Sequence, residues 1–138
     1  MVRIVCCVNL IILNEENKLL LLKRAGVGDE NDDFVGYYCI AGGTVEQEET
    51  FEKALHREIE EEIGAEIVKN NYFKSFYYVV NDDLHVRAVY FYGKINGEIK
   101  LNEESDGFKW FGFEEVKKEK LAFNQNQVLS EFIEFYEK

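Results

Sequence analysis

The glutamates between positions 58 and 62 are the residues whose types and spacing best suit chemistry. Residues 50–63 have the apolar spacing of a helix, with Thr50 suited to its start and Gly64 to its end. At about 100° per residue, Glu58 and Glu62 fall within about 40° of each other, on the face that also carries the apolar side chains. Two carboxylates that approach an apolar interior repel each other and are costly to desolvate. We therefore expect a cation at this face of the helix.

A divalent metal ion is the cation that fits this pattern best. Mg²⁺ and Mn²⁺ prefer carboxylate oxygens, and side chains one helical turn apart can converge on one ion. Arg57 alone cannot neutralise the neighbouring carboxylates. Gly42 and Gly43 lie upstream, after a short apolar run, and a glycine pair lets the backbone approach a metal ion or a phosphate closely.

The alternative for any glutamate-rich helix is a solvated face with ion pairs such as Arg57 with Glu61. That interpretation accounts for Glu52, Lys53 and Glu60. It does not account for the glutamates that share the inward face.

The spacing of these residues, taken together, resembles the Nudix box. Its glycines, glutamates and arginine have counterparts at Gly43, Glu49, Arg57-Glu58-Ile59, Glu61-Glu62 and Gly64-Ala65. The chain departs from the family pattern at Ala41, Glu48 and Ala65, where many members have proline, glycine and a larger aliphatic residue. None of these departures removes a charge that the chemistry uses. We identify residues 1–138 as a single Nudix hydrolase domain.

The resemblance implies an enzyme that hydrolyses a diphosphate linkage in a nucleoside diphosphate joined to another group. It implies Mg²⁺ or Mn²⁺ as the cofactor. The implied metal ligands are the Gly42 carbonyl and the side chains of Glu49, Glu58, Glu61 and Glu62. Glu49 would act as a supporting ligand from a second position.

The resemblance also implies a catalytic group made of Arg57, Glu61, Glu62 and Glu104. Arg57 would orient Glu58 or Glu61, and Glu61 is a further ligand or the base that positions water. Family members differ in which carboxylate serves as the base, and Glu104 in the acidic loop 102–106 is the candidate outside the box. A solvated acidic loop is the alternative for Glu104.

Two residues are implied to contact substrate. Gly43 would lie against the phosphates. Arg24 ends an expected strand, where many relatives place a basic side chain on a substrate phosphate. The alternative for Arg24 is a surface charge paired with the acidic loop 29–33.

A nucleoside triphosphate, cleaved to monophosphate and pyrophosphate, is the first substrate that we expect. The chain is short and contains no proline, whereas many ADP-ribose-cleaving relatives carry one shortly after the box. ADP-ribose, dinucleoside polyphosphates and nucleotide sugars stay open. Phe34, Tyr37 and Tyr38 could stack on a base, although core packing is the default for an aromatic residue. A catalytically weak nucleotide-binding module is the alternative from another class, and the intact box argues against it.

Apolar, aromatic and β-branched segments must position this helix. The expected strands are residues 4–13 and 18–23 as one hairpin, 72–80 and 84–92 as a second hairpin, and 37–40 and 108–111 as single strands. Residues 124–136 predict an amphipathic helix with Val128, Phe132, Ile133 and Phe135 near one face. Strands mixed with two or three helices indicate an α/β fold. The resemblance specifies an α/β/α sandwich, a mixed β-sheet between helices.

Composition excludes several classes of protein. A hydrophobic content of 46% is incompatible with intrinsic disorder. Sixteen basic residues against twenty-seven acidic ones leave a net charge of −11, which repels polyanions and argues against a nucleic-acid polymer as partner. A small phosphate ester would approach such a surface only with metal cations in between. The expected partner is a small-molecule nucleotide, bound by a monomer or a homodimer.

The N-terminal apolar segment favours neither a membrane span nor a signal peptide. Residues 4–13 fall far short of the roughly 20 residues that cross a bilayer. An acidic run follows them where a signal peptide needs small residues. Cys6, Cys7 and Cys39 have no metal-site or redox spacing and are expected to be buried, reduced thiols. We expect a cytoplasmic protein.

Overall fold

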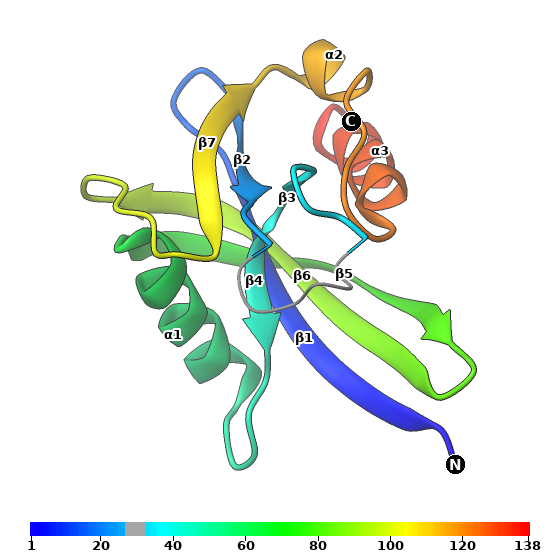
Figure 1. Ribbon diagram of the computed structural model, residues 1–138. Helices are drawn as coiled ribbons and strands as arrows, with labels where there is room; N and C mark the ends of the chain where they lie inside the picture. Colours follow the sequence, from blue (N-terminus) through cyan, green and yellow to red (C-terminus); the bar gives the residue numbers. More distant parts are fainter. Residues whose placement is uncertain (27–32) are drawn as a thin grey trace.

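Two β-sheets and three helices make up the computed structural model, which describes residues 1–26 and 33–138 (Figure 1). The strands are β1 (Arg3–Ile12), β2 (Leu19–Arg24), β3 (Tyr38–Cys39), β4 (Ala41–Thr44), β5 (Glu66–Asn81), β6 (Leu84–Asn96) and β7 (Ser105–Phe111). The helices are α1 (Phe51–Ile63), α2 (Phe113–Val116) and α3 (Gln125–Tyr136).

The larger sheet is mixed and has the strand order β4-β1-β6-β5. Its central pair, β1 and β6, is parallel over ten residue pairs, and both flanking pairs are antiparallel. The smaller sheet is antiparallel, in the order β3-β2-β7. The mixed sheet with helices confirms the expected α/β class.

The helices lie on opposite sides of the sheets, and α1 is separated from α2 and α3 (Figure 1). The strands β1 and β2 explain this layering, because alternate side chains of a strand point to opposite faces. Leu10 and Leu20 pack in the hydrophobic cluster that contains Ile59 of α1. Their neighbours Ile11 and Leu21 pack in the cluster that contains Phe132 of α3, among other residues. Each of the two strands is therefore apolar on both faces, as a strand between two layers must be.

The first expected hairpin is wrong in its pairing. A tight turn at residues 14–18 joins β1 to β2. Among the described residues, however, the two segments meet at one isolated antiparallel bridge, between Leu13, which directly follows β1, and Leu19. Beyond that bridge, β1 enters the larger sheet and β2 the smaller one. The physical reason is that two strands apolar on both faces can pair with any strand that completes a layer, so closeness in sequence does not decide their partners.

The second hairpin and the other elements follow the prediction more closely. The strands β5 and β6 form one antiparallel pair about the turn at Asp82 and Asp83, and they extend well beyond the expected ends. Of the strand expected at residues 37–40, only Tyr38–Cys39 forms a strand, β3; the next strand, β4, begins at Ala41 and belongs to the other sheet. In α3, Val128, Phe132 and Ile133 are buried as expected, whereas Phe135 is 46% exposed.

Among the described residues, none of the three cysteines forms a disulfide, as expected for reduced side chains. Cys39 is buried, but Cys6 and Cys7 are half-buried, so the prediction of full burial is wrong for these two residues. They lie in the part of β1 where the pairing with β4 ends, which leaves that strand less covered. In the described part of the chain, no helix has the length and apolarity that crossing a membrane requires.

Candidate active site

Helix α1 carries the carboxylates and is defined by local signals at both ends. The Thr50 hydroxyl accepts a hydrogen bond from the Lys53 amide at 3.1 Å, and Gly64 ends the helix with φ 64°, in the left-handed region. The buried stripe runs through Ala54, Leu55, Ile59 and Ile63. Phe51, which would begin that stripe, is 42% exposed instead.

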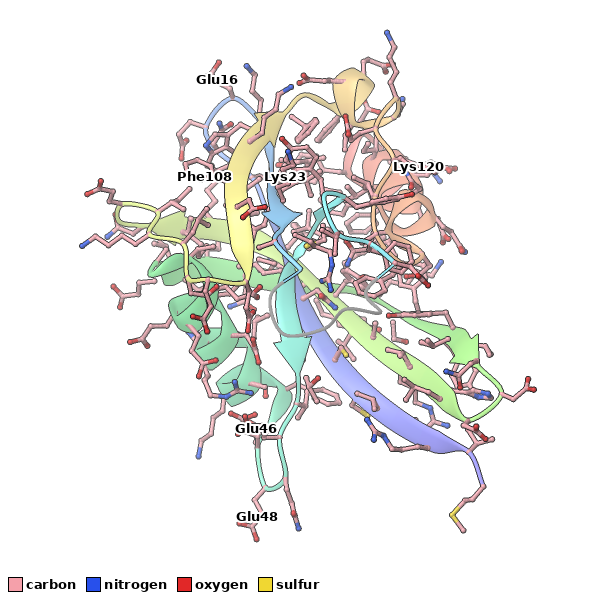
Figure 2. All side chains as sticks on the ribbon, viewed as in Figure 1. Glu16, Lys23, Glu46, Glu48, Phe108 and Lys120 are labelled. Atoms are coloured by element: carbon pink, nitrogen blue, oxygen red, sulfur yellow. The ribbon has the colours of Figure 1, made fainter. Side chains whose placement is uncertain are left out.

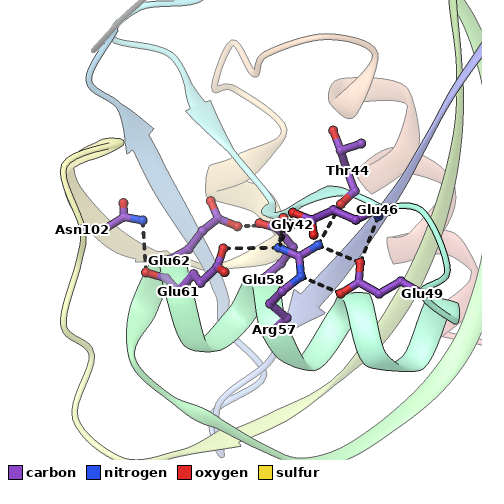
Figure 3. Close-up of polar contacts among 9 residues, drawn as sticks. All are labelled: Gly42, Thr44, Glu46, Glu49, Arg57, Glu58, Glu61, Glu62 and Asn102. Carbon is purple, nitrogen blue, oxygen red and sulfur yellow. Dashed lines mark hydrogen bonds and ion pairs between the residues drawn. The ribbon is translucent and has the colours of Figure 1, made fainter.

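Glu62 is the most deeply buried carboxylate of the helix. Only 8% of the residue is exposed, and one oxygen, Oε1, accepts a hydrogen bond from the Gly42 amide at 2.7 Å (Figure 3). Burial raises the pKa of Glu62 to about 8, in spite of that hydrogen bond. Among the described residues, no ion pair involves this carboxylate. Glu62 is therefore a buried acid held against the backbone of β4.

Glu58 lies one turn earlier and faces the next glycine. A Cβ atom at Gly43 would come within 2.4 Å of the Glu58 carboxyl carbon, so the absent side chain makes room for the carboxylate. Burial raises the pKa of Glu58, and the neighbouring Arg57 guanidinium opposes that rise. The two glycines and the two glutamates thus face each other across the β4–α1 contact.

Arg57 gathers most of the remaining carboxylates around one guanidinium (Figure 3). Two donors on one edge of the guanidinium bind the two oxygens of Glu49: Nε donates to Oε2 at 2.6 Å, and Nη2 donates to Oε1 at 2.9 Å. Nη1 binds Glu58 at 2.8 Å and Glu61 at 3.3 Å, and Nη2 also donates to the Thr44 carbonyl at 3.0 Å. Arg57 thus contacts both Glu58 and Glu61, and its role in orienting them stays a prediction. The paired hydrogen bonds from Arg57 lower the pKa of Glu49 to about 2.

The side chain of Glu49 closes a turn in the loop between β4 and α1. The Glu46 amide donates to Glu49 Oε1 at 2.9 Å, and the Glu49 amide donates to the Glu46 carbonyl at 3.2 Å. Between them, Glu48 adopts φ 66°, in the left-handed region. Glu48 is the position where the sequence departs from the glycine of the family pattern, so the turn keeps a conformation that glycine would adopt without strain.

The described residues contain no group of three or more His, Cys, Asp or Glu side chains already arranged to hold a metal ion. The contacts explain why, because the carboxylates beside Arg57 turn toward its guanidinium and Glu62 turns toward the Gly42 amide. The donor set fits a hard divalent cation all the same. Glu58 and Glu62 offer oxygen ligands one turn apart, and burial makes their charge costly without a cation.

A cavity of about 210 Å³ opens beside the carboxylates and includes Gly42, Gly43, Glu62 and Arg24 in its lining. Arg24 ends β2 as expected, and its guanidinium lies 5.0 Å from the centroid of the Phe123 ring. The alternative partner of Arg24, the acidic loop 29–33, lies mostly outside the described residues, which omit 27–32.

Phe123 and Tyr78 line both this cavity and a second one. The second cavity, about 340 Å³, is lined by Phe34, Tyr78 and Phe123 among others. Phe123 has φ 56°, and its ring centroid lies 4.8 Å from that of Phe34. Of the aromatic residues considered for base stacking, Phe34 borders this space, whereas Tyr38 packs edge-on against the buried Phe111.

The loop that carries Glu104 is bound to the end of α1. The Asn102 side chain donates to the Glu61 carbonyl at 3.0 Å, and the Asn102 amide donates to the Glu62 carbonyl at 3.3 Å. The negative charge of Glu104 contributes to the raised pKa of both Glu58 and Glu62. The exposed Glu104 carboxylate therefore acts electrostatically on the same site.

Several residues of this site escape prediction from the sequence. Asn9, Thr44, Phe123 and Gln125 line the first cavity, and Asn102 joins the Glu104 loop to the helix. Asn9 has a signal, because it is the one polar residue in the apolar run 4–13. The others have no local pattern, since their positions depend on contacts between distant segments.

Known proteins resemble this chain in sequence and in fold. The family model described as NUDIX domain matches residues 5–132 of the chain. The chain belongs to the Nudix hydrolase family. An ADP-ribose pyrophosphatase of Methanocaldococcus jannaschii is 30% identical over 125 residues, which cover 88% of this chain and 69% of the relative. The nucleoside triphosphatase NudI of Escherichia coli K12 is 29% identical over 113 residues, 72% of this chain and 76% of the relative.

The solved structures agree on the fold of this Nudix hydrolase. A MutT protein from Methanosarcina mazei superposes with a TM-score of 0.85 and 24% identity, and the match covers 99% of this chain and 98% of that one. Nudix hydrolases act on small nucleotide substrates and generally use divalent metal ions. The α/β architecture and the enzyme class are thereby confirmed.

Proposed function

We propose that this Nudix hydrolase breaks a diphosphate linkage in a nucleoside diphosphate joined to another group, with Mg²⁺ or Mn²⁺ as cofactor. The observation that carries the proposal is that two carboxylates, the buried Glu62 and the half-buried Glu58, lie against the backbone of Gly42 and Gly43. A hard cation shared with a diphosphate would offset the cost of burying their charge. A bound divalent ion neutralises phosphate charge and makes water more acidic.

The metal ligands in this proposal are Glu58, Glu61, Glu62, the Gly42 carbonyl and, from further away, Glu49. Glu49 takes the supporting place because both of its oxygens bind Arg57. Arg57 keeps the carboxylates of Glu49 and Glu58 in one orientation and is itself held by the Thr44 carbonyl.

Hydrolysis also needs a proton acceptor. The water oxygen forms a bond to phosphorus, the bond from phosphorus to the leaving oxygen breaks, and a carboxylate takes the proton of the water. Glu61, Glu62 and Glu104 are the three candidates in reach of the site. Glu61 and Glu104 are exposed, so solvent water can reach them more easily than the buried Glu62.

Arg24 and Gly43 are proposed to contact substrate. Both residues line the 210 Å³ cavity, together with the buried Glu62. Arg24 carries the positive charge that a phosphate requires, and Gly43 lets a phosphate approach the backbone. The aromatic cavity beyond Phe123 supplies an apolar surface of the kind on which a nucleobase stacks.

A nucleoside triphosphate, split into monophosphate and pyrophosphate, is the first substrate that we propose, and ADP-ribose is the second. One similar relative is named a nucleoside triphosphatase and another an ADP-ribose pyrophosphatase. The chain contains no proline, which favours the triphosphate. Dinucleoside polyphosphates and nucleotide sugars are the remaining candidate substrates.

A product screen tests the proposal. The protein is incubated with nucleoside triphosphates, ADP-ribose, dinucleoside polyphosphates and nucleotide sugars in Mg²⁺ or Mn²⁺, and the released pyrophosphate or monophosphate is measured. We expect turnover of at least one triphosphate to monophosphate and pyrophosphate. Binding of nucleotides without turnover of any substrate would instead support a sensing module and contradict the proposed activity.

We also propose that residues 1–138 form one domain, which acts as a monomer or a homodimer. No nucleic-acid polymer or membrane is proposed as a partner, because a net charge of −11 repels polyanions and anionic lipids alike. Three free cysteines suit a reducing compartment such as the cytoplasm.

A further inference from the structure

The segment that follows β6 returns to the C-terminal turn of α1 and binds its free carbonyl groups. The Lys100 amide donates to the Ile63 carbonyl at 2.7 Å, and the Asn102 amide donates to the Glu62 carbonyl at 3.3 Å. The Asn102 side chain donates from Nδ2 to the Glu61 carbonyl at 3.0 Å (Figure 3). These carbonyls have no partner within the helix, so the segment replaces the solvent that would otherwise bind them.

The same Asn102 side chain also holds Glu104. Its Oδ1 accepts a hydrogen bond from the Glu104 amide at 2.9 Å. On the other side, the Glu104 carbonyl accepts a hydrogen bond from the Ala25 amide at 3.0 Å, next to the end of β2. Glu104 is therefore fixed between the carboxylate-bearing helix and the strand that carries Arg24.

The side chain of Asn102 suits this place chemically. A carboxamide has a donor group and an acceptor oxygen on one planar group, so it can bind the helix carbonyl and the loop amide at the same time. An alanine can do neither. Because the charge of Glu104 acts on Glu58 and Glu62, a displacement of the Glu104 backbone would change the electrostatic environment of both carboxylates.

We propose that Asn102 is a positioning residue, which bridges α1 to the Glu104 backbone and thereby holds Glu104 between α1 and the end of β2, at the edge of the candidate site. The proposal rests on the proposed function, in which Glu104 is one of the candidate bases. Asn102 touches neither substrate nor metal in this role, and its effect passes through Glu104.

A double-mutant cycle of Asn102→Ala and Glu104→Gln tests this role. On the substrate found in the screen, we expect Asn102→Ala to lower kcat by about 10-fold with little change in KM, since a misplaced catalytic group costs rate more than binding. Glu104→Gln should lower kcat by at least as much. The double variant should be no slower than Glu104→Gln alone, within about a factor of two, because Asn102 then has nothing left to position.

Asn14→Ala is the matched control. The Asn14 side chain also holds a turn through two hydrogen bonds, since its Oδ1 accepts from the Glu16 and Lys18 amides at 2.9 Å each, and Asn14 lines neither cavity of the candidate site. Asn14→Ala should lower the melting temperature about as much as Asn102→Ala but leave kcat unchanged. A parallel loss of kcat in both variants would reduce Asn102 to a structural role.

The cycle is also run with Mn²⁺ affinity as the readout, measured by calorimetry without substrate. Asn102→Ala and Glu104→Gln should each weaken Mn²⁺ binding several-fold, and the two losses should not add. Unchanged kcat and Mn²⁺ affinity in either single variant, or additive losses in the double variant, would overturn the role of Asn102. If the wild-type chain hydrolyses no substrate, the proposed function fails, and the Mn²⁺ cycle still decides the role of Asn102.

Discussion

Glu62 and Glu58 differ in the kind of partner that meets each carboxylate. Glu58 binds a guanidinium, whereas Glu62 binds the backbone amide of Gly42. A backbone amide is a partial charge and compensates a buried anion less completely than a guanidinium does. Glu62 is thus the residue at which a metal ion would relieve the largest electrostatic cost.

Replacing Glu62 by glutamine is the sharpest test at the scale of one residue. Glu62→Gln keeps the size of the side chain and an oxygen for the Gly42 amide, but removes the negative charge. We expect turnover to fall by about 100-fold or more, the range seen when an electrostatic group of an active site is lost. The melting temperature of the metal-free protein should stay the same or rise near neutral pH, because Glu62 must take up a proton to be buried, whereas glutamine is neutral already. Steady-state kinetics and thermal melting measure the two effects.

Glu60→Gln is the control for that experiment, since Glu60 is exposed on the same helix. The two changes are chemically identical and two positions apart, so only the face of the helix distinguishes them. Glu60→Gln should alter neither turnover nor stability. Equal activity losses in both variants would contradict the assignment of Glu62 to the metal site.

The raised pKa of Glu62 predicts how the stability of the metal-free protein depends on pH. The folded state keeps a proton up to about pH 8, whereas an unfolded glutamate releases it near its ordinary pKa of about 4.3. The folded state binds more protons in this interval, so the free energy of unfolding falls as pH rises from about 4.3 to about 8. The slope from this group is at most about 1.4 kcal/mol per pH unit.

Urea unfolding in excess chelator, at several pH values, measures this slope. Glu62→Gln cannot titrate, so its stability should decline less over the same interval. A wild-type protein whose decline matches that of Glu62→Gln would show that Glu62 does not keep its proton in the folded state.

At the scale of elements, the contact between α1 and the preceding loop decides the shape of the site. Arg57 joins the helix to Thr44 and Glu49, and the Glu46–Glu49 turn shapes the loop between them. Both the strand end and the helix are therefore held by one side chain. A loop of this kind accepts a strained residue, because the surrounding hydrogen bonds over-determine its conformation.

Glu48→Gly is predicted to stabilise the protein. Glu48 has φ 66°, which costs an ordinary residue about 1–2 kcal/mol, whereas glycine adopts it freely at the price of greater freedom in the unfolded chain. The net gain should be about 0.5–1 kcal/mol, or about 2–4 °C in melting temperature. Glu48→Ala is the control, since it removes the carboxylate but keeps the strained backbone, and it should show no such gain. A similar gain in Glu48→Ala would attribute the effect to charge instead.

At the scale of the whole molecule, the charge of −11 sets the conditions under which the enzyme meets its substrate. Both the protein and a nucleotide are anionic, so each repels the other at long range. Divalent cations at Glu58 and Glu62, as proposed, would reduce that repulsion at the site itself. Metal binding and substrate binding should therefore depend on each other.

Mn²⁺ and Mg²⁺ are predicted to raise the melting temperature of the protein without any substrate. A ligand that binds only the folded state stabilises it by about 2.7 kcal/mol at 100 times its dissociation constant. Differential scanning calorimetry at increasing metal concentration measures this rise, and Glu62→Gln should show a smaller one. Turnover should stop in excess chelator, and undiminished turnover there would rule out the metal dependence.

The ends of α1 and the face on which its side chains lie could be predicted from the sequence, because their determinants are local. The order of Glu58, Ile59 and Glu62 along the chain decides which side chains share a face, and Thr50 and Gly64 mark the ends of the helix. The helical repeat converts that order directly into directions in space. The intact box likewise identified the family, since its offsets are fixed along the chain.

Only the tertiary structure decided what meets that face. Gly42 lies 20 positions before Glu62, and Asn102 lies 41 positions after Glu61, yet each forms a hydrogen bond with its partner. The separation of β1 and β2 into different sheets has the same origin. Apolar strands and backbone donors accept many partners of similar energy, so the choice among them depends on how all the layers pack together rather than on any local pattern.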